Sequence, residues 1–223
     1  MKTLARNLFL IGFLMILPAA ALAQRKNPPP AARGATIAPA FDYGTIAGNV
    51  YTNKSFGLRF AAPEGWETQE RDFNRALVKT GSRVVKGRTA QMQKSLNNVE
   101  QSTRVLFAAK KGLGTAGAAN FICAAESVRG NLISSGTDYL RATLSGYRQA
   151  VMPPGYRVDS EIKQDRLGAN ALPFFEAGTP DLRQRFYAIK RGNYAVFFVL
   201  TYQEEADLEV MRSVLTNADF ALR

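Results

Sequence analysis

The chain contains no histidine among its 223 residues. Histidine is the commonest general base in enzymes, a frequent metal ligand and the base that activates the nucleophile of serine and cysteine triads. Its absence argues against triad hydrolases and against zinc sites built from histidine and cysteine. We therefore predict no catalytic residue, no metal site and no cofactor site.

Cysteine is almost as scarce, since Cys123 is the only one in the sequence. A disulfide within the chain is impossible, so the fold must be stabilised by its core. Cys123 lies in the apolar segment NFICAAE, residues 120–126, where a free cysteine behaves as a small buried hydrophobe. We predict that this thiol is structural and is not a nucleophile.

Long apolar runs are also missing. Residues 8–17 form an apolar segment that is too short for the ~20 residues of a membrane helix. It follows Lys2 and Arg6 and precedes Ala21-Leu22-Ala23, which together match the charged start, apolar core and small-residue cleavage site of a secretory signal peptide. We predict a signal peptide at residues 1–23 and no transmembrane segment in the mature chain.

The residue after the predicted cleavage site is Gln24, where a bacterial lipoprotein would have cysteine. We therefore expect a periplasmic or secreted protein, separated from the cytoplasmic pools of ATP and NAD. Cleavage would leave 200 residues with 27 basic and 18 acidic side chains, a net charge of +9. This excess favours anionic partners over cationic ones.

Composition divides the mature chain into two regions. Residues 24–43 include Pro28, Pro29 and Pro30 among alanine, glycine and basic residues, which is typical of a flexible or extended linker. Residues 44–223 show no second linker and no internal repeat, so we predict a single globular domain. The 46% hydrophobic content of the whole sequence is that of an ordinary globular protein.

Hydrophobic patterning predicts the layers of this domain. In residues 194–202 both alternate sets of positions are apolar, which indicates a central strand covered on both faces. It is expected to form a hairpin with residues 185–189 across a turn at residues 190–193. Amphipathic helices predicted after Ser135 and after Glu204 would supply the covering layers. We predict an α+β fold, an α/β/α sandwich around a central, mainly antiparallel sheet.

Two segments carry a family resemblance. VYTNKSFGLRFAAPEGW, residues 50–66, is similar to the start of PsbP-like domains, and QRFYAIKRGNYAVFFVLTYQEEADLEVMRSVLTNADF, residues 184–220, is similar to their end. The resemblance implies this sandwich, as in photosystem subunits and Mog-type regulators that bind a GTPase. It also implies an exported binding or assembly module. PsbP-like domains share no catalytic motif, so the resemblance transfers no site residues.

Three short motifs match functional patterns without the context that those functions need. Residues 112–117 have G-x-G-x-x-G spacing, but Lys110 and Lys111 replace the apolar strand end of a dinucleotide fold. Ser160 and Lys163 have S-x-x-K spacing in a segment that is predicted to be extended, where they would point to opposite faces. The acidic residues at 204–209 suit a helix N-terminus better than a calcium loop.

One charge feature is a candidate binding site. Residues 73–99 contain six basic residues and no acidic ones, within a helical pattern that is broken near Gly81. We predict that this basic ridge contacts an anionic envelope component or an acidic partner protein, with an ordinary solvated helix face as the alternative. Nucleic acid is not expected, because aromatic residues do not interleave with the charges. The basic ridge consists of Arg75, Lys79, Arg83, Lys86, Arg88 and Lys94.

The sequence therefore predicts an exported, non-catalytic binding or accessory module. The alternative is an extracytoplasmic hydrolase that uses carboxylates or lysine. Such an enzyme would need acidic side chains that converge in a pocket, for which the candidates are Asp159, Glu161, Asp165 and Glu176.

Overall fold

A computed structural model describes residues 41–69, 86–87, 89–90, 93, 102–112, 119–129 and 131–221, without the side chains of residues 86 and 87. The predicted signal peptide and most of the linker lie outside the described residues. The same is true of the basic ridge apart from the backbone of Lys86. In the part of the chain that is described, no helix is long and apolar enough to cross a membrane.

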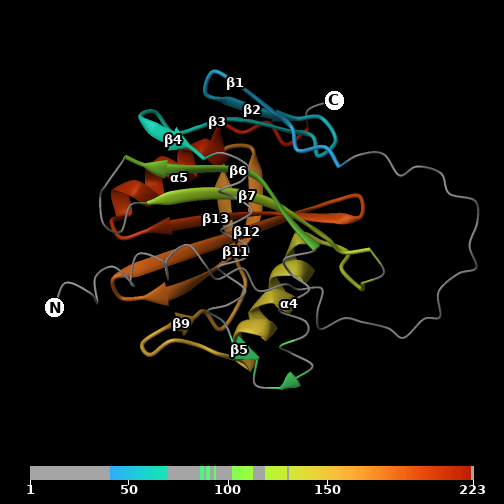
Figure 1. Ribbon diagram of the computed structural model, residues 1–223, viewed down its shortest axis with the longest axis vertical. Helices are drawn as coiled ribbons and strands as arrows, with labels where there is room; N and C mark the ends of the chain where they lie inside the picture. Colours follow the sequence, from blue (N-terminus) through green and yellow to red (C-terminus); the bar gives the residue numbers. More distant parts are fainter. Residues whose placement is uncertain are drawn as a thin grey trace, which may run out of the picture.

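The domain is organised around an antiparallel sheet in the strand order β10-β11-β12-β13-β7-β6-β4, with the short strand β9 also paired to β11 (Figure 1). The sheet places segments that are far apart in sequence on neighbouring strands. Its strands are β4 (Trp66–Thr68), β6 (Thr103–Lys111), β7 (Asn120–Ser127), β9 (Arg157–Val158), β10 (Lys163–Leu167), β11 (Asn170–Thr179), β12 (Leu182–Arg191) and β13 (Tyr194–Tyr202).

Strand β13 lies in the middle of this order, between β12 and β7. Eight of its nine residues are buried, on both faces of the sheet. The register runs from Arg191 opposite Tyr194 to Arg183 opposite Tyr202, so β12 and β13 form the expected hairpin. The prediction of a central strand covered on both faces is confirmed.

The two faces of the sheet are covered differently. Helix α4 (Gly136–Gln149) packs on one face, against Phe175, Phe186 and Phe197. Helix α5 (Glu205–Thr216) shares the other face with a small antiparallel sheet of β1 (Thr45–Ala47), β2 (Val50–Asn53) and β3 (Leu58–Ala61). The predicted α+β fold is therefore confirmed. The difference is that the layer opposite α4 consists of α5 together with the small three-stranded sheet, and not of helices alone.

Aromatic side chains explain why the small sheet shares the layer with α5. Strand β3 alternates buried and exposed residues, so that Leu58 and Phe60 point inward. Phe60 lies 5.2 Å from Phe107 and 5.6 Å from Phe121, measured between ring centroids. Burial of these apolar side chains is the main driving force that attaches the hairpin to the sheet.

Helix α4 begins as the sequence predicts. The Ser135 hydroxyl accepts a hydrogen bond from the backbone N–H of Asp138 and donates one to its carboxylate, which caps the first turn. Gly136 follows the cap and lies directly against β12, where a Cβ atom would overlap the carbonyl oxygen of Ala188. The helix therefore approaches the sheet backbone more closely than a larger residue would allow.

The strands after α4 begin with a short one. Within residues 156–162 only Arg157 and Val158 form a strand, β9, and the next strand, β10, occupies the polar segment KQDRL, residues 163–167. Strand β11 follows at residues 170–179. Lys86 and Gly87 form β5, which pairs with β8 (Ala150–Val151).

Candidate functional site

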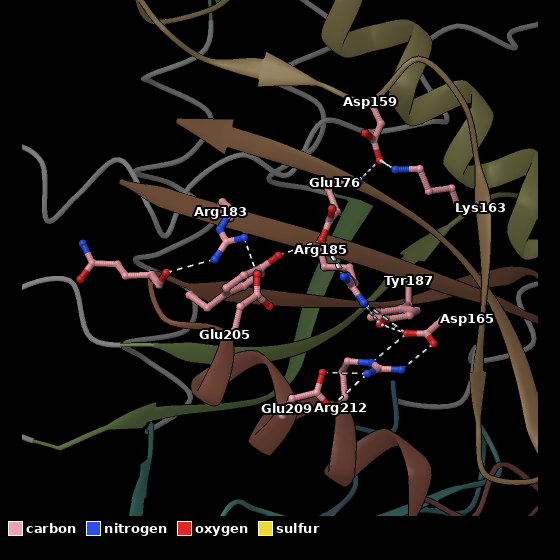
Figure 2. A network of polar contacts seen from close by, with 12 residues as sticks. Asp159, Lys163, Asp165, Glu176, Arg183, Arg185, Tyr187, Glu205, Glu209 and Arg212 are labelled. Atoms are coloured by element: carbon pink, nitrogen blue, oxygen red, sulfur yellow. Dashed lines mark hydrogen bonds and ion pairs between the residues drawn. The ribbon is translucent and has the colours of Figure 1, made fainter. Parts of the chain in front are cut away.

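The structure brings charged side chains together where β10, β11, β12 and β13 meet α5 (Figure 2). The acidic side chains come from β10, β11 and α5, and the basic ones come from β12 and α5. We call this group the charged network. It consists of Asp165, Glu176, Arg183, Arg185, Tyr187, Tyr202, Glu205, Glu209 and Arg212.

Asp165 lies near the centre of the charged network, and its side chain is 10% exposed. Its Oδ1 accepts a hydrogen bond from Arg212 Nη2 at 2.7 Å. Its Oδ2 accepts from Tyr187 Oη at 2.7 Å, from Arg212 Nε at 3.0 Å and from Arg185 Nη1 at 3.3 Å. Together, the two carboxylate oxygens therefore accept hydrogen bonds from three other side chains.

These contacts determine the protonation of Asp165. Burial pushes its pKa upward, but hydrogen bonds from Arg212 and Tyr187 and the charges of Arg212 and Arg185 outweigh burial, so the net pKa is lowered. Asp165 is consequently ionised at neutral pH and is poorly suited to donate a proton. Burial raises the pKa of Tyr187, which keeps its hydroxyl protonated as a donor.

Arg185 connects Asp165 to Glu176. Register places Glu176 of β11 directly opposite Arg185 of β12. Arg185 Nε and Nη2 lie 2.9 and 2.8 Å from Glu176 Oε1, which also accepts a hydrogen bond from Tyr202 Oη at 2.8 Å. Its guanidinium group additionally stacks on the ring of Phe174, 4.6 Å from the centroid. The two carboxylates are therefore bridged by a guanidinium group and do not form an acid–base pair.

The other two carboxylates of the hydrolase alternative lie outside this centre. Asp159 Oδ2 accepts the backbone N–H of Glu176 at 2.9 Å and forms an ion pair with Lys163 at 3.0 Å. Glu161 is exposed in the bend before β10. In the described part of the structure, Asp165 and Glu176 are therefore bridged by Arg185, whereas Asp159 pairs with Lys163 and Glu161 is exposed.

Acidic residues at the start of α5 pair with cations from the sheet. Glu205 forms an ion pair with Arg183, whose guanidinium group lies 4.6 Å from the Tyr202 ring centroid. Asp207 Oδ1 lies 2.6 Å from Lys111 Nζ. Ion pairs and the positive helix N-terminus account for these carboxylates without a calcium ion. Among the described residues, no group of acidic, histidine or cysteine side chains is arranged to hold a metal.

The remaining sequence motifs also take structural positions. Cys123 is fully buried in β7, and burial raises the pKa of its thiol, as expected for a structural cysteine. Ser160 lies in a bend and Lys163 in β10, so they do not share a helix face. Gly112 follows β6 with φ of 55°, and residues 113–118 of the glycine-rich loop lie outside the described residues.

A pocket of about 520 Å³ lies between the small sheet and β6. The sequence gives no local signal for this pocket, because four separate segments line it. Its described lining is mixed apolar and polar without an acidic side chain, so it does not supply the paired carboxylates of a hydrolase. The lining residues are Tyr43, Gly44, Thr45, Ile46, Tyr51, Thr68, Gln69, Val105, Leu106 and Phe107.

Comparison with known proteins finds similarity in structure but not in sequence. No protein-family model matches the chain. No curated protein matches it. It is similar to the solution structure of cyanobacterial PsbP (CyanoP) from Synechocystis sp. PCC 6803, with 11% identity and a TM-score of 0.42 over 78% of this chain and 96% of that chain. This similarity concerns the path of the chain alone.

Proposed function

We propose that this chain is an exported, non-catalytic binding or accessory module that contacts an anionic envelope surface through the basic ridge. The proposal rests on how charge is distributed along the sequence. Residues 41–69, 102–112, 119–129 and 131–221, which contain almost all of the described domain, hold 16 basic and 15 acidic side chains. Residues 70–101 hold seven basic and three acidic ones, and residues 24–40 hold three basic and none acidic.

The charged network supports the non-catalytic part of the proposal. Arginine and tyrosine donors bind Asp165 and Glu176, and the lowered pKa of Asp165 opposes proton donation. An acid–base hydrolase needs one carboxyl group that is protonated near neutral pH and faces the substrate. Guanidinium groups between the carboxylates favour a structural role over a hydrolytic one.

The position of the excess charge supports the binding part. In the described domain the basic and acidic side chains are nearly equal in number. Residues 70–101, which contain the basic ridge, have more than twice as many basic as acidic side chains. A lysine or arginine near an anionic membrane contributes about 1 kcal/mol, and this attraction falls within a Debye length. Binding should therefore depend on salt and on the ridge in particular.

Cosedimentation with vesicles tests the proposal. Vesicles of phosphatidylethanolamine and phosphatidylglycerol should bind the mature chain at about 0.15 M ionic strength and release it at about 1 M, where the Debye length is about 3 Å. The double variant Lys79→Glu and Arg83→Glu should bind at least about tenfold more weakly. Vesicles of phosphatidylcholine alone provide the neutral control.

A matched variant separates the ridge from net charge. Arg157→Glu together with Arg166→Glu changes the charge by the same amount at exposed positions on β9 and β10. We expect this variant to bind almost as well as the wild type. Equal losses in the two double variants, or binding that salt does not change, would exclude the ridge as the contact.

A further inference from the structure

Strand β1 is the free edge of the small sheet, at the top of Figure 1. On one side it pairs with β2, from Thr45 opposite Thr52 to Ala47 opposite Val50. On its other side no strand of the described residues pairs with it, and all three of its residues are exposed. An exposed edge of this kind presents backbone N–H and C=O groups that can pair with another chain.

The register shows which backbone groups lie at this edge. Ala47 and Val50 flank a two-residue turn, so they form the closing pair of a hairpin and exchange backbone hydrogen bonds. Bonded and non-bonded pairs alternate along an antiparallel ladder, so Thr45 also directs its backbone groups toward β2. The N–H and C=O of Ile46, between them, therefore face outward.

The side chain of Ile46 lies beside the pocket between the small sheet and β6. Ile46 is opposite Tyr51 in the register, so the two side chains lie on the same face of the small sheet. That face packs on the main sheet, since the Tyr51 ring lies 5.6 Å from the Phe107 ring, measured between centroids. Tyr51 is 1% exposed but Ile46 is 46% exposed. Ile46 therefore lines the pocket of about 520 Å³ without being enclosed by the core.

Contacts with Tyr51 fix the chain that leads into β1. Tyr51 Oη donates a hydrogen bond to the Tyr43 carbonyl at 3.0 Å. Gly44, with φ of 74°, lies so close that a Cβ atom would overlap the Thr52 carbonyl oxygen and the Tyr51 hydroxyl. The β1 edge and the pocket beside it are therefore formed in the absence of a ligand, which lowers the cost of binding one.

The lining of the pocket indicates the chemistry of its ligand. Ile46, Leu106 and Phe107 supply apolar surface, and Thr68 and Gln69 supply polar groups. No charged side chain is among the described lining residues. A charged group would lose water here without gaining an ionic partner, so the lining favours an uncharged one. The volume is within the range of about 300–1,000 Å³ that is typical of ligand sites.

The edge of the main sheet formed by β10 provides a comparison. Its sequence KQDRL includes Lys163, Asp165 and Arg166. Charges on an edge strand discourage pairing with a second chain. The β1 sequence TIA has neither a charge nor a proline. The edge beside the pocket therefore lacks the chemical protection that β10 has.

We propose that β1 binds an extended, uncharged segment of a partner protein, which adds to the small sheet as a fourth strand. Backbone hydrogen bonds to Ile46 provide affinity, and the pocket selects an apolar or aromatic side chain of the segment. A peptide is favoured over a small molecule or a lipid, because the outward backbone groups of Ile46 match those of an extended chain. The inference goes beyond the proposed function and does not depend on the basic ridge.

Selection from a displayed library of random octapeptides on the immobilised mature chain tests the proposal. We expect enrichment of uncharged peptides in which β-branched or aromatic residues alternate with polar ones. In fluorescence anisotropy, an enriched peptide should bind no more weakly at about 1 M than at about 0.15 M ionic strength, unlike anionic vesicles. The absence of enriched peptides, or enrichment of charged or proline-rich ones, would overturn the proposal.

Substitutions at Ile46 test the site. Ile46→Pro removes the outward N–H and preserves the ladder with β2, since an edge strand tolerates proline where its N–H faces solvent. Ile46→Asp introduces a charge beside the pocket. Each variant should bind the selected peptide at least about tenfold more weakly than the wild type.

Two control variants should bind the peptide within about twofold of the wild type. Ile46→Val retains the N–H and an apolar side chain. Leu132→Asp introduces the same charge as Ile46→Asp at a residue that is 72% exposed and does not line the pocket. Circular dichroism should show the same folded signal for all four variants. Equal peptide binding by Ile46→Pro, Ile46→Asp and the wild type would exclude β1 as the site.

Methylation of the peptide backbone separates strand pairing from simple occupation of the pocket. N-methyl groups at the alternate positions that face β1 should abolish binding, and N-methyl groups at the intervening positions should leave it unchanged. Equal effects of the two sets would overturn strand pairing. A mature chain that is dimeric and becomes monomeric with Ile46→Pro would make a second copy the occupant and would overturn a separate partner.

The vesicle and peptide experiments fail independently. Loss of vesicle binding with intact peptide binding would overturn the proposed function and leave this inference in place. Vesicle binding without any peptide binding would overturn this inference alone.

Discussion

The centre and the edge of the main sheet are stabilised by different interactions. Strand β13 in the centre has apolar residues on both faces, packed against α4 on one side and against α5 and β3 on the other. Strand β10 at the edge is mostly polar, and only Leu167 is buried. Asp165 connects this edge to α5 and β12 through hydrogen bonds and ion pairs.

The difference has energetic consequences. Apolar burial is non-directional, and it is large when a side chain is fully enclosed. Ion pairs at a half-exposed edge contribute less, and they depend on pH and salt. The centre should therefore set the global stability of the domain, while the edge should respond most to solution conditions.

The largest expected effect is at the centre. Phe198 is fully buried, with the rings of Phe60, Phe121 and Phe220 within 6.3 Å of its own, measured between centroids. Phe198→Ala should lower the free energy of unfolding by about 3–5 kcal/mol in urea denaturation. The control Arg166→Ala on the exposed side of β10 should cost less than about 0.5 kcal/mol. Similar costs for both would contradict the contrast between centre and edge.

The next effect is at the edge. Asp165→Asn keeps the shape of the side chain and removes its charge, so that Arg185 and Arg212 lose a carboxylate partner. We expect a loss of about 2–3 kcal/mol at pH 7. Glu209→Gln is the matched control, because Glu209 also pairs with Arg212 but has a side chain that is 63% exposed. Its cost should stay below about 1 kcal/mol, and an equal or larger cost would show that burial does not decide the strength of these pairs.

Acid should remove the contribution of the Asp165 carboxylate to the free energy of unfolding. The folded pKa is lower than the unfolded value of about 3.9, so the ionised carboxylate stabilises the folded state above that value. This stabilisation is lost as pH falls through the folded pKa. The stability difference between wild type and Asp165→Asn should therefore be constant from pH 7 to about 5 and shrink below about pH 4. A difference that grows on acidification would mean that Asp165 is not held as a carboxylate.

The same contrast explains which elements could be predicted from the sequence. Residues 194–202 are apolar at both odd and even positions, which is the pattern of a central strand. The segment KQDRL gives no such pattern, because its inward-facing Asp165 is satisfied by Arg212 from a helix 47 residues away. An edge strand that is stabilised by partners distant in sequence has no local hydrophobic period to detect.

For the candidate site, the sequence identifies some of the residues but not how they are arranged in space. Asp165 and Glu176 could be named as acidic side chains, but the guanidinium group of Arg185 between them depends on the register of β11 and β12. The basic ridge stays a prediction from sequence alone.

The smallest expected effect concerns an exposed ion pair on β6, which lies near the opposite edge of the main sheet from β10. Lys111, at the end of β6, forms an ion pair with Asp207 of α5, and the lysine side chain is 54% exposed. Lys111→Met keeps the apolar stem and should lower the free energy of unfolding by less than about 1 kcal/mol, with a smaller loss at high salt. Lys110→Met, on the opposite face of the same strand, is the matched control. A loss above about 2 kcal/mol for Lys111→Met alone would mean that solvent does not weaken this ion pair. The pair would then stabilise the packing of α5 as strongly as the apolar face of the helix does.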